Sequence, residues 1–282
     1  MNNKRYVDMH LHSYFSDGSM SPEELVASAH RNGVSVLALA DHDMLDGNKI
    51  FEDECKKYNM SYIPAVEIDT REGIANHHVL AYGFDIYEES FREYIKHVRF
   101  MLDEISVKLI DLMQRDYTDL SLSEYMDFSY DRELGGWKGL HYLLNKGLIS
   151  SLKEGIKFYS EYGVTYDKSG YSSISIVSHR IKKAGGYSVL AHPGETIDTS
   201  NTDTFRKELQ QIVSYGIDGI ECYYPSHSKE ITEICVDICK NYNLLITTGS
   251  DCHGSFGKAK VGEMHITLDQ IFLKDLLERK MV

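Results

Sequence analysis

The chain has 282 residues, of which 42% are hydrophobic, so it is long enough for one large α/β domain or two ordinary ones. Its formal net charge of −13 argues against a stable complex with a long nucleic acid. The five cysteines form no CxxC pair, which argues against a thiolate metal site and favours a reducing cytoplasm. The N-terminus has no apolar signal region, and the best apolar run, VSVLALA, is far shorter than the ~20 residues of a membrane span.

Seven segments have the patterning of strands, at about 6–12, 34–40, 61–67, 77–83, 187–191, 217–223 and 244–249. Several are continuous apolar runs, which are typical of strands buried on both faces of a parallel sheet. Helical patterns alternate with them near 21–33, 46–58, 172–185, 202–215 and 228–242. In the first, Ser21 and Glu24 form a capping box around Pro22, and Gly33 ends the helix. This alternation predicts a parallel α/β fold, open or closed.

Residues 84–171 interrupt the alternation of strands and helices. Their patterns are helical throughout, in EESFREYIKHVRFMLDEISVKLIDLMQ, GGWKGLHYLLNKG and SLKEGIKFYSEYG. The segment is too long for a loop and too helical for disorder. We therefore expect a helical insertion subdomain between the fourth and fifth strands, acting as a substrate lid. Residues 1–83 and 172–282 would form the domain that it interrupts.

Histidines and carboxylates stand at the carboxyl end of every predicted strand. In the first, DMHLHS, the alternation sends His10 and His12 out of the same face. Asp17 follows in the motif SDG, and the later strand ends supply Asp41, His42, Asp43, Glu67, His77, His78, His192, Glu221, His227, Asp251 and His253. In a parallel α/β barrel or sheet these ends share one edge, where active sites lie.

A single histidine or carboxylate at a strand end is most often a satisfied polar residue. Seven such ends at one edge are different, because a dense cluster of imidazoles and carboxylates is costly to bury unless cations neutralise it. Nitrogen and oxygen ligands without thiolate suit Zn, Mn or Fe. The sequence therefore predicts a metal centre in which the HxH of DMHLHS is one ligand pair.

The chain resembles the polymerase and histidinol phosphatase (PHP) superfamily of metal-dependent phosphoesterases. The resemblance rests on the ordered motifs DMHLHS, SDG, DHD, AVEI, HHVLAYG, AHPG, GIECYYPSHS and GSDCHG. It covers nearly the whole chain apart from the insertion. It implies a distorted seven-stranded barrel, (β/α)7, with two to three divalent metal ions at its mouth.

The resemblance also implies a ligand set for each ion. One metal would take His10, His12, Glu67 and Asp251. A second would share Glu67 and add His78 and His192, and a third would take Asp17, His42 and His253. His78 matches the family's H-[IV]-L-x-[YG]-G pattern, and by alternation His77 must point the opposite way. Many relatives have a histidine where Asp17 stands here.

For a PHP phosphoesterase, the implied nucleophile is a hydroxide that bridges two metals, because coordination lowers the pKa of water toward ~7. Asp251 is expected to act at this centre. His227 is a candidate for donating a proton to the leaving oxygen or for binding phosphate, and the backbone at Gly194 for approaching a phosphate closely. The expected substrate is a small phosphomonoester, with nucleotides and nucleoside 3′,5′-bisphosphates among the candidates.

Relatives with an insertion here often carry a GRPH-like motif and an arginine soon after AHPG, and act on nucleotides and short oligonucleotides. This chain has GGWKGLH and Glu195 instead, so two arginines that would clamp a second phosphate are missing. Lys138 is the candidate substitute, as a point charge. Trp137 would either stack on a base or pack helix against helix, and packing is the favoured interpretation.

Three functions remain open at this stage. The first is a phosphoesterase on a small phosphomonoester, with a phosphodiesterase or exonuclease on short oligonucleotides as its variant. The second is an amidohydrolase-like metal hydrolase, against which no strand-end lysine is found and Glu67 fills the bridging position. The third is a non-catalytic PHP regulatory module, against which the ligand set is complete.

Overall fold

The computed structural model describes residues 5–73, 75–165 and 168–278. Its strands form two sheets. The first is parallel and contains β1 (Tyr6–Asp8), β2 (Val34–Leu37) and β3 (Ser61–Tyr62). The second has the order β4 (Ala65–Glu72), β5 (Ala75–Tyr82), β6 (Tyr187–Leu190), β7 (Gly219–Tyr223) and β8 (Leu245–Thr248).

The α/β class is confirmed, but the closed (β/α)7 barrel is not. β5 runs antiparallel to both of its neighbours, β4 and β6, and only β6, β7 and β8 are mutually parallel in the larger sheet. Isolated parallel bridges, Leu11 with Cys252 and His42 with Glu67, join the edges of the two sheets where a closed barrel would have continuous ladders.

The segment predicted as one strand over 61–67 is two strands, β3 and β4. Pro64 lies between them and has no N–H to donate to a ladder, so pairing stops there. β1 also ends earlier than expected, at Asp8, and the chain after it stays buried through Ser13.

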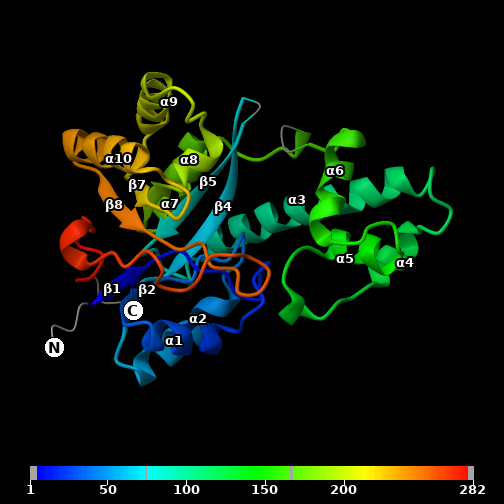
Figure 1. Cartoon of the computed structure of the whole chain (residues 1–282), viewed down its shortest axis with the longest axis horizontal. Helices are drawn as coiled ribbons and strands as arrows, with labels where there is room; N and C mark the ends of the chain where they lie inside the picture. Colours follow the sequence, from blue (N-terminus) through cyan, green and yellow to red (C-terminus); the bar gives the residue numbers. More distant parts are fainter. Residues whose placement is uncertain (1–4, 74, 166–167, 279–282) are drawn as a thin grey trace.

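Helices cover the sheets on both sides, as Figure 1 shows: α1 and α2 lie below, and α7 to α10 lie above. Their bounds are α1 (Pro22–Arg31), α2 (Asp46–Lys57), α7 (Ile174–Lys183), α8 (Pro193–Thr196), α9 (Thr202–Ser214) and α10 (Lys229–Tyr242). The predicted capping box of α1 is present, with Ser21 and Glu24 each bonded to the other's backbone N–H. Gly33 follows with a φ of 74°, a conformation that favours glycine. A 3-10 turn, η3 (Leu268–Gln270), lies near the C-terminus.

The inserted segment is helical, as the sequence predicts, and extends to the right in Figure 1. It contains α3 (Glu89–Met113), α4 (Leu122–Asp127), η1 (Arg132–Leu134), α5 (Lys138–Asn145) and α6 (Leu152–Glu161). One buried hydrophobic cluster joins Val66 of β4, Val98 of α3, Leu143 of α5 and Val177 of α7. The insertion therefore shares a core with the larger sheet.

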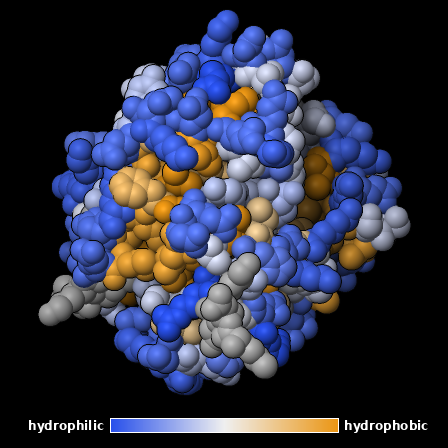
Figure 2. Space-filling view, turned by 60° about the vertical axis from the view of Figure 1, so that its left-hand side comes forward, coloured by the Kyte–Doolittle hydropathy of each residue, from blue (hydrophilic) through white to orange (hydrophobic). Residues whose placement is uncertain are grey.

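The face of the molecule shown in Figure 2 is mostly hydrophilic, and the largest group of apolar residues on it gathers on the left-hand side. Among the described residues, no helix has both the length and the apolar character that crossing a membrane requires.

Candidate metal centre

The predicted ligands gather at one place although the strands are not all parallel. His10 and His12 follow β1, His42 follows β2, and His192, Asp251 and His253 follow β6 and β8. Glu67 is the third residue of β4. β5 is antiparallel to β4, and His78, in the first half of β5, pairs with Asp69. Glu67 and Asp69 are two residues apart in β4 and lie on the same face, so His78 faces the same site as Glu67.

The first predicted ligand set is assembled around the HxH motif. His10 Nε2 lies 3.2 Å from Glu67 Oε2, and His12 Nε2 lies 3.3 Å from the same oxygen and 3.0 Å from Asp251 Oδ1. One ligand atom from each of the four residues falls within 4.8 Å of the others. His10 and His12 are completely buried, so their imidazole rings lie inside the protein and not on an exposed strand face.

The second predicted set shares Glu67 with the first. His78 Nδ1 and His192 Nε2 each lie 2.9 Å from Glu67 Oε1. Glu67 thus directs Oε2 to one group of histidines and Oε1 to another. A carboxylate in this position is able to bridge two cations.

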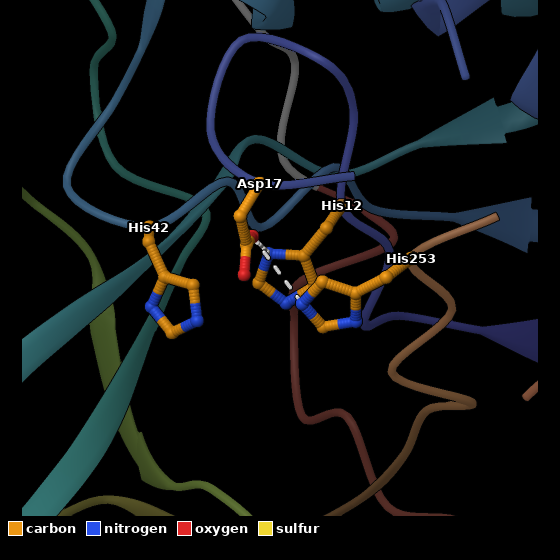
Figure 3. Close-up of side chains that lie close together, drawn as sticks. All are labelled: His12, Asp17, His42 and His253. Carbon is orange, nitrogen blue, oxygen red and sulfur yellow. Dashed lines mark ion pairs between the residues drawn. The ribbon is translucent and has the colours of Figure 1, made fainter. Parts of the chain in front are cut away.

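The third predicted set is formed by Asp17, His42 and His253, and the structure adds His12 to it. Figure 3 shows the four side chains converging, with Asp17 between His42 and the two stacked rings of His12 and His253. Asp17 Oδ1 lies 3.3 Å from His253 Nε2 and 3.7 Å from His12 Nδ1. His12 therefore presents one ring nitrogen to each of two sets.

The donor atoms of these sets fit cations. Their buried ring nitrogens and carboxylate oxygens face one another, yet several have no hydrogen-bond partner among the described residues: His10 Nε2, His12 Nδ1 and Nε2, His42 Nδ1, Glu67 Oε2, His192 Nδ1 and Asp251 Oδ1. Buried polar atoms are normally paired, so each unpaired atom calls for a partner. Divalent cations between these residues would satisfy the atoms that face the carboxylates, such as His10 Nε2 and His12 Nε2, because imidazole nitrogen and carboxylate oxygen are their usual ligands.

Strained backbone conformations occur at the centre. Asp43, His192 and Asp251 have φ values of 49°, 27° and 55°, in the region that side chains other than glycine rarely adopt. Such conformations cost free energy and persist where the surrounding structure imposes them. Holding His192 and Asp251 in these backbone conformations therefore costs the folded state free energy.

Charge and burial divide the histidines into two kinds. Burial lowers the pKa of His42 to about 4, which keeps its imidazole neutral, the form that binds a metal. Burial also disfavours the charged form of His253, but the carboxylate of Asp17 outweighs it and raises the pKa of His253 to about 10, so this ring must lose its proton when it binds a cation. The surrounding histidines hold the pKa of Asp17 below its usual range despite its burial. The site therefore keeps Asp17 ionised.

Three residues that the sequence analysis did not assign hold the ligands in place. Glu221, fully buried, lies 3.1 Å from His10 Nδ1 and accepts the His192 backbone N–H. Asp69 Oδ1 lies 3.3 Å from His78 Nε2. Tyr224 donates its hydroxyl to Asp251 Oδ2, 2.8 Å away, which leaves Oδ1 to the site. Such partners fix the tautomer and orientation of metal ligands.

The expected opposition of His77 and His78 is present in β5. His78 faces Glu67, whereas His77 Nδ1 lies 3.0 Å from the Thr196 hydroxyl of α8. None of the cation-binding groups found among the described residues includes His77.

Two of the three predicted substrate residues contact each other. His227 Nδ1 lies 3.0 Å from the Cys222 carbonyl, and His227 Nε2 accepts the Gly194 N–H at 3.0 Å. This pair of bonds selects the neutral tautomer with the proton on Nδ1. In this arrangement Nε2 has no proton to donate and the Gly194 N–H is not available to a phosphate. A side chain at position 194 would collide with His227, since a Cβ there would lie 2.6 Å from His227 Cδ2.

The third predicted substrate residue, Lys138, points away from the metal centre. Its ammonium donates to the Met126 carbonyl at 3.0 Å and lies 4.7 Å from the centre of the Tyr125 ring. Trp137, its neighbour, does reach the centre, with its ring 5.7 Å from that of His42.

The chain is similar to known proteins over most of its length. The PHP domain model matches residues 8–262. A 5′-3′ exoribonuclease from Haemophilus influenzae is 27% identical over 269 residues, covering 95% of this chain and 97% of that protein. A 3′,5′-nucleoside bisphosphate phosphatase from Chromobacterium violaceum is 24% identical over 253 residues, covering 88% and 87%. A solved chain from Bifidobacterium adolescentis, described as a metal-dependent phosphoesterase, has the same fold, with a TM-score of 0.74, 23% identity and coverage of 92% and 91%.

Proposed function

The chain belongs to the PHP domain family, and from this premise we propose that it hydrolyses small phosphomonoesters with divalent metal ions as cofactors. The observation that carries the proposal is the set of buried, unpaired imidazole and carboxylate atoms around Glu67. A regulatory module without catalysis has no need for such a costly arrangement. The overlapping donor groups around Glu67 and His12 support two to three ions.

We assign the ligands as the sequence predicts. His10, His12, Glu67 and Asp251 hold one ion, while Glu67, His78 and His192 hold a second. Asp17, His42 and His253 hold a third. The nitrogen and oxygen donors suit Mn, Zn or Fe. When bound, such ions lower the pKa of water toward ~7 and stabilise the negative charge that develops on a phosphoryl group.

The chain's own residues supply orientation. Glu221 and Tyr224 hold His10 and Asp251, so that the atoms facing the site do not need to reorganise during the reaction. The burial of His10, His12 and Glu67 excludes bulk water from this side of the site, which strengthens every electrostatic interaction within it. If His227 is to protonate the leaving oxygen, it must first release the Gly194 N–H.

The alternative function is a phosphodiesterase or exonuclease on short oligonucleotides. The similarity to the Haemophilus influenzae exoribonuclease, which spans 95% of this chain, favours it. The net charge of −13 opposes a stable complex with a long nucleic acid in either case. Both functions share the same metal centre and differ in the bond that is cleaved.

The proposal is tested by measuring inorganic phosphate release with added Mn²⁺ from simple phosphomonoesters, mononucleotides and nucleoside bisphosphates, with the Asp251→Ala variant as the blank. Release of mononucleotides from short oligonucleotides is measured in parallel, because cleavage of a phosphodiester liberates no inorganic phosphate. We expect turnover of at least one phosphomonoester that the variant lacks, together with lower metal content in the variant. Turnover of short oligonucleotides alone would favour the alternative. Full metal content with no turnover of any substrate would contradict both.

A further inference from the structure

Arg99, in the third turn of α3, reaches from the insertion toward the metal centre. Its side chain is only 15% exposed. The guanidinium carbon lies 5.4 Å from the centre of the Trp137 ring, and that ring in turn lies 5.7 Å from the His42 ring. Arg99 therefore neighbours the centre through Trp137, whose ring contacts both Arg99 and His42.

The hydrogen bonds of Arg99 leave one side of its guanidinium unused. Nη2 donates to Asp103 Oδ1 at 3.0 Å and Nε donates to Asp103 Oδ2 at 3.3 Å. Nη1 is buried and has no hydrogen-bond partner among the described residues. A buried unpaired N–H of a charged group is costly, and an anionic oxygen is the partner that a guanidinium binds best. The two bonds to Asp103 fix the orientation of the Arg99 guanidinium before a substrate binds.

We propose that Arg99 binds a second anionic group of the substrate, a phosphate beyond the one that the metal centre holds. This inference rests on the proposed function. Arg99 supplies, from α3, a guanidinium where GGWKGLH and Glu195 supply none. It favours phosphomonoesters that carry a second phosphate over those that do not.

The surroundings of Arg99 also accommodate an organic group. A cavity of about 540 Å³ is lined by Trp137 and Asp103, the two residues that contact the guanidinium, and by the rings of Tyr125, Tyr159 and Phe256. Its volume is within the range of small-molecule sites, which are about 300–1,000 Å³. Neither Arg99 nor a proposed metal ligand lines this cavity, but Trp137, which contacts both Arg99 and His42, does.

The test compares adenosine 3′,5′-bisphosphate with adenosine 3′- and 5′-monophosphate on the Mn²⁺-loaded protein. Arg99→Gln removes the charge, and Arg99→Lys keeps it without the fork. Arg115→Gln is the matched control, because Arg115 also lies in this insertion and pairs with the aspartate four residues away, Asp111, but is 68% exposed. We expect Arg99→Gln to lower kcat/KM on the bisphosphate by about 10- to 100-fold and to change the monophosphates less than twofold. Arg99→Lys should fall between.

Binding gives a second readout. Trp137 is the only tryptophan in the sequence, so its fluorescence reports on the Arg99 surroundings. Titrating adenosine 3′,5′-bisphosphate into Ca²⁺-loaded protein, with turnover verified to be absent, should show a Kd raised about 10- to 100-fold by Arg99→Gln and unchanged by Arg115→Gln.

Equal losses on bisphosphate and monophosphates would overturn the inference and leave Arg99 as a residue that only packs against Trp137. A wild-type enzyme that releases phosphate from monophosphates but not from the bisphosphate would overturn it as well. Absence of phosphate release from every substrate is a different result, because it contradicts the proposed function itself.

Discussion

Two of the candidate ligand histidines use one ring nitrogen for the site and keep the other for the protein, whereas His12 presents both of its ring nitrogens to the site. His10 directs Nδ1 to Glu221, and His253 directs Nδ1 to the Asp251 carbonyl, so Nε2 of each faces the carboxylates. The HxH pattern and strand-end motifs are enough to predict from the sequence which side chains gather at the candidate centre. The residues that orient them are not predictable in the same way, because Glu221, Asp69 and Tyr224 are defined by contacts between distant segments.

His77 and His78 provide a matched pair for testing the ligand assignment. We expect His78→Ala to weaken metal binding by more than the 10- to 100-fold that losing an outer partner costs, because it removes a donor that faces Glu67. His77→Ala loses a contact with the Thr196 hydroxyl instead, so it should cost about 1 kcal/mol of stability and retain the metal. Bound Mn²⁺ per chain after dialysis checks both. If the two variants lost metal equally, the assignment of His78 would be wrong.

At the scale of elements, the error in the predicted topology lies in the β4–β5 hairpin. The segment between the predicted strands at 61–67 and 77–83 has fewer than ten residues, whereas a parallel crossover requires a dozen or more. That length indicates an antiparallel pair, which is what the structure contains. His78 stands near the start of its strand, not at the carboxyl end where the sequence analysis placed it. The consequence for function is small, because the antiparallel direction of β5 brings that start to the edge where Asp69 and Glu67 of β4 lie.

Hydrogen bonds join the insertion to the loop that carries Asp17. The Arg132 guanidinium donates to the carbonyls of Tyr14, Phe15 and Ser16 at 3.1, 3.0 and 2.7 Å, and the Gly136 N–H donates to the Asp17 carbonyl at 2.7 Å. These bonds position the loop that carries Asp17, a member of the third proposed ligand set. A lid that opens along this edge would have to break them, so the lid role stays a prediction.

Substituting Arg132 tests how much these hydrogen bonds contribute to stability. We expect Arg132→Gln to lower the free energy of unfolding by about 2 kcal/mol, since hydrogen bonds to a charged group contribute roughly 1.5–3 kcal/mol. Urea denaturation measures the change. Arg115→Gln, which removes an exposed pair with Asp111 at 3.5 Å, should change it by less than about 0.5 kcal/mol. A similar small effect for both variants would show that the contact between insertion and loop is held by packing alone.

At the scale of the whole molecule, the metal centre lies where elements from both ends of the chain meet. Its ligands span His10 to His253, and the β1, β2, β6 and β8 ends and the β4–β5 pair all contribute. Bringing these buried carboxylates and imidazoles together is costly without cations. The metal ions that we propose for catalysis should therefore also stabilise the fold.

Removing metal should lower the thermal stability of the entire chain. At a free metal concentration 100 times Kd, one ion that binds only the folded state contributes about 2.7 kcal/mol, which corresponds to roughly 5–10 °C in Tm for a chain of this size. We expect EDTA to lower Tm by at least this amount and added Mn²⁺ to restore it. Asp251→Ala should respond less to Mn²⁺, because it loses a ligand of the first set, whereas Arg115→Gln should respond as the wild type does. A Tm that EDTA leaves unchanged would mean that the unpaired donors around Glu67 are stable without cations, and the assignment of this cluster as a metal centre would fall with that result.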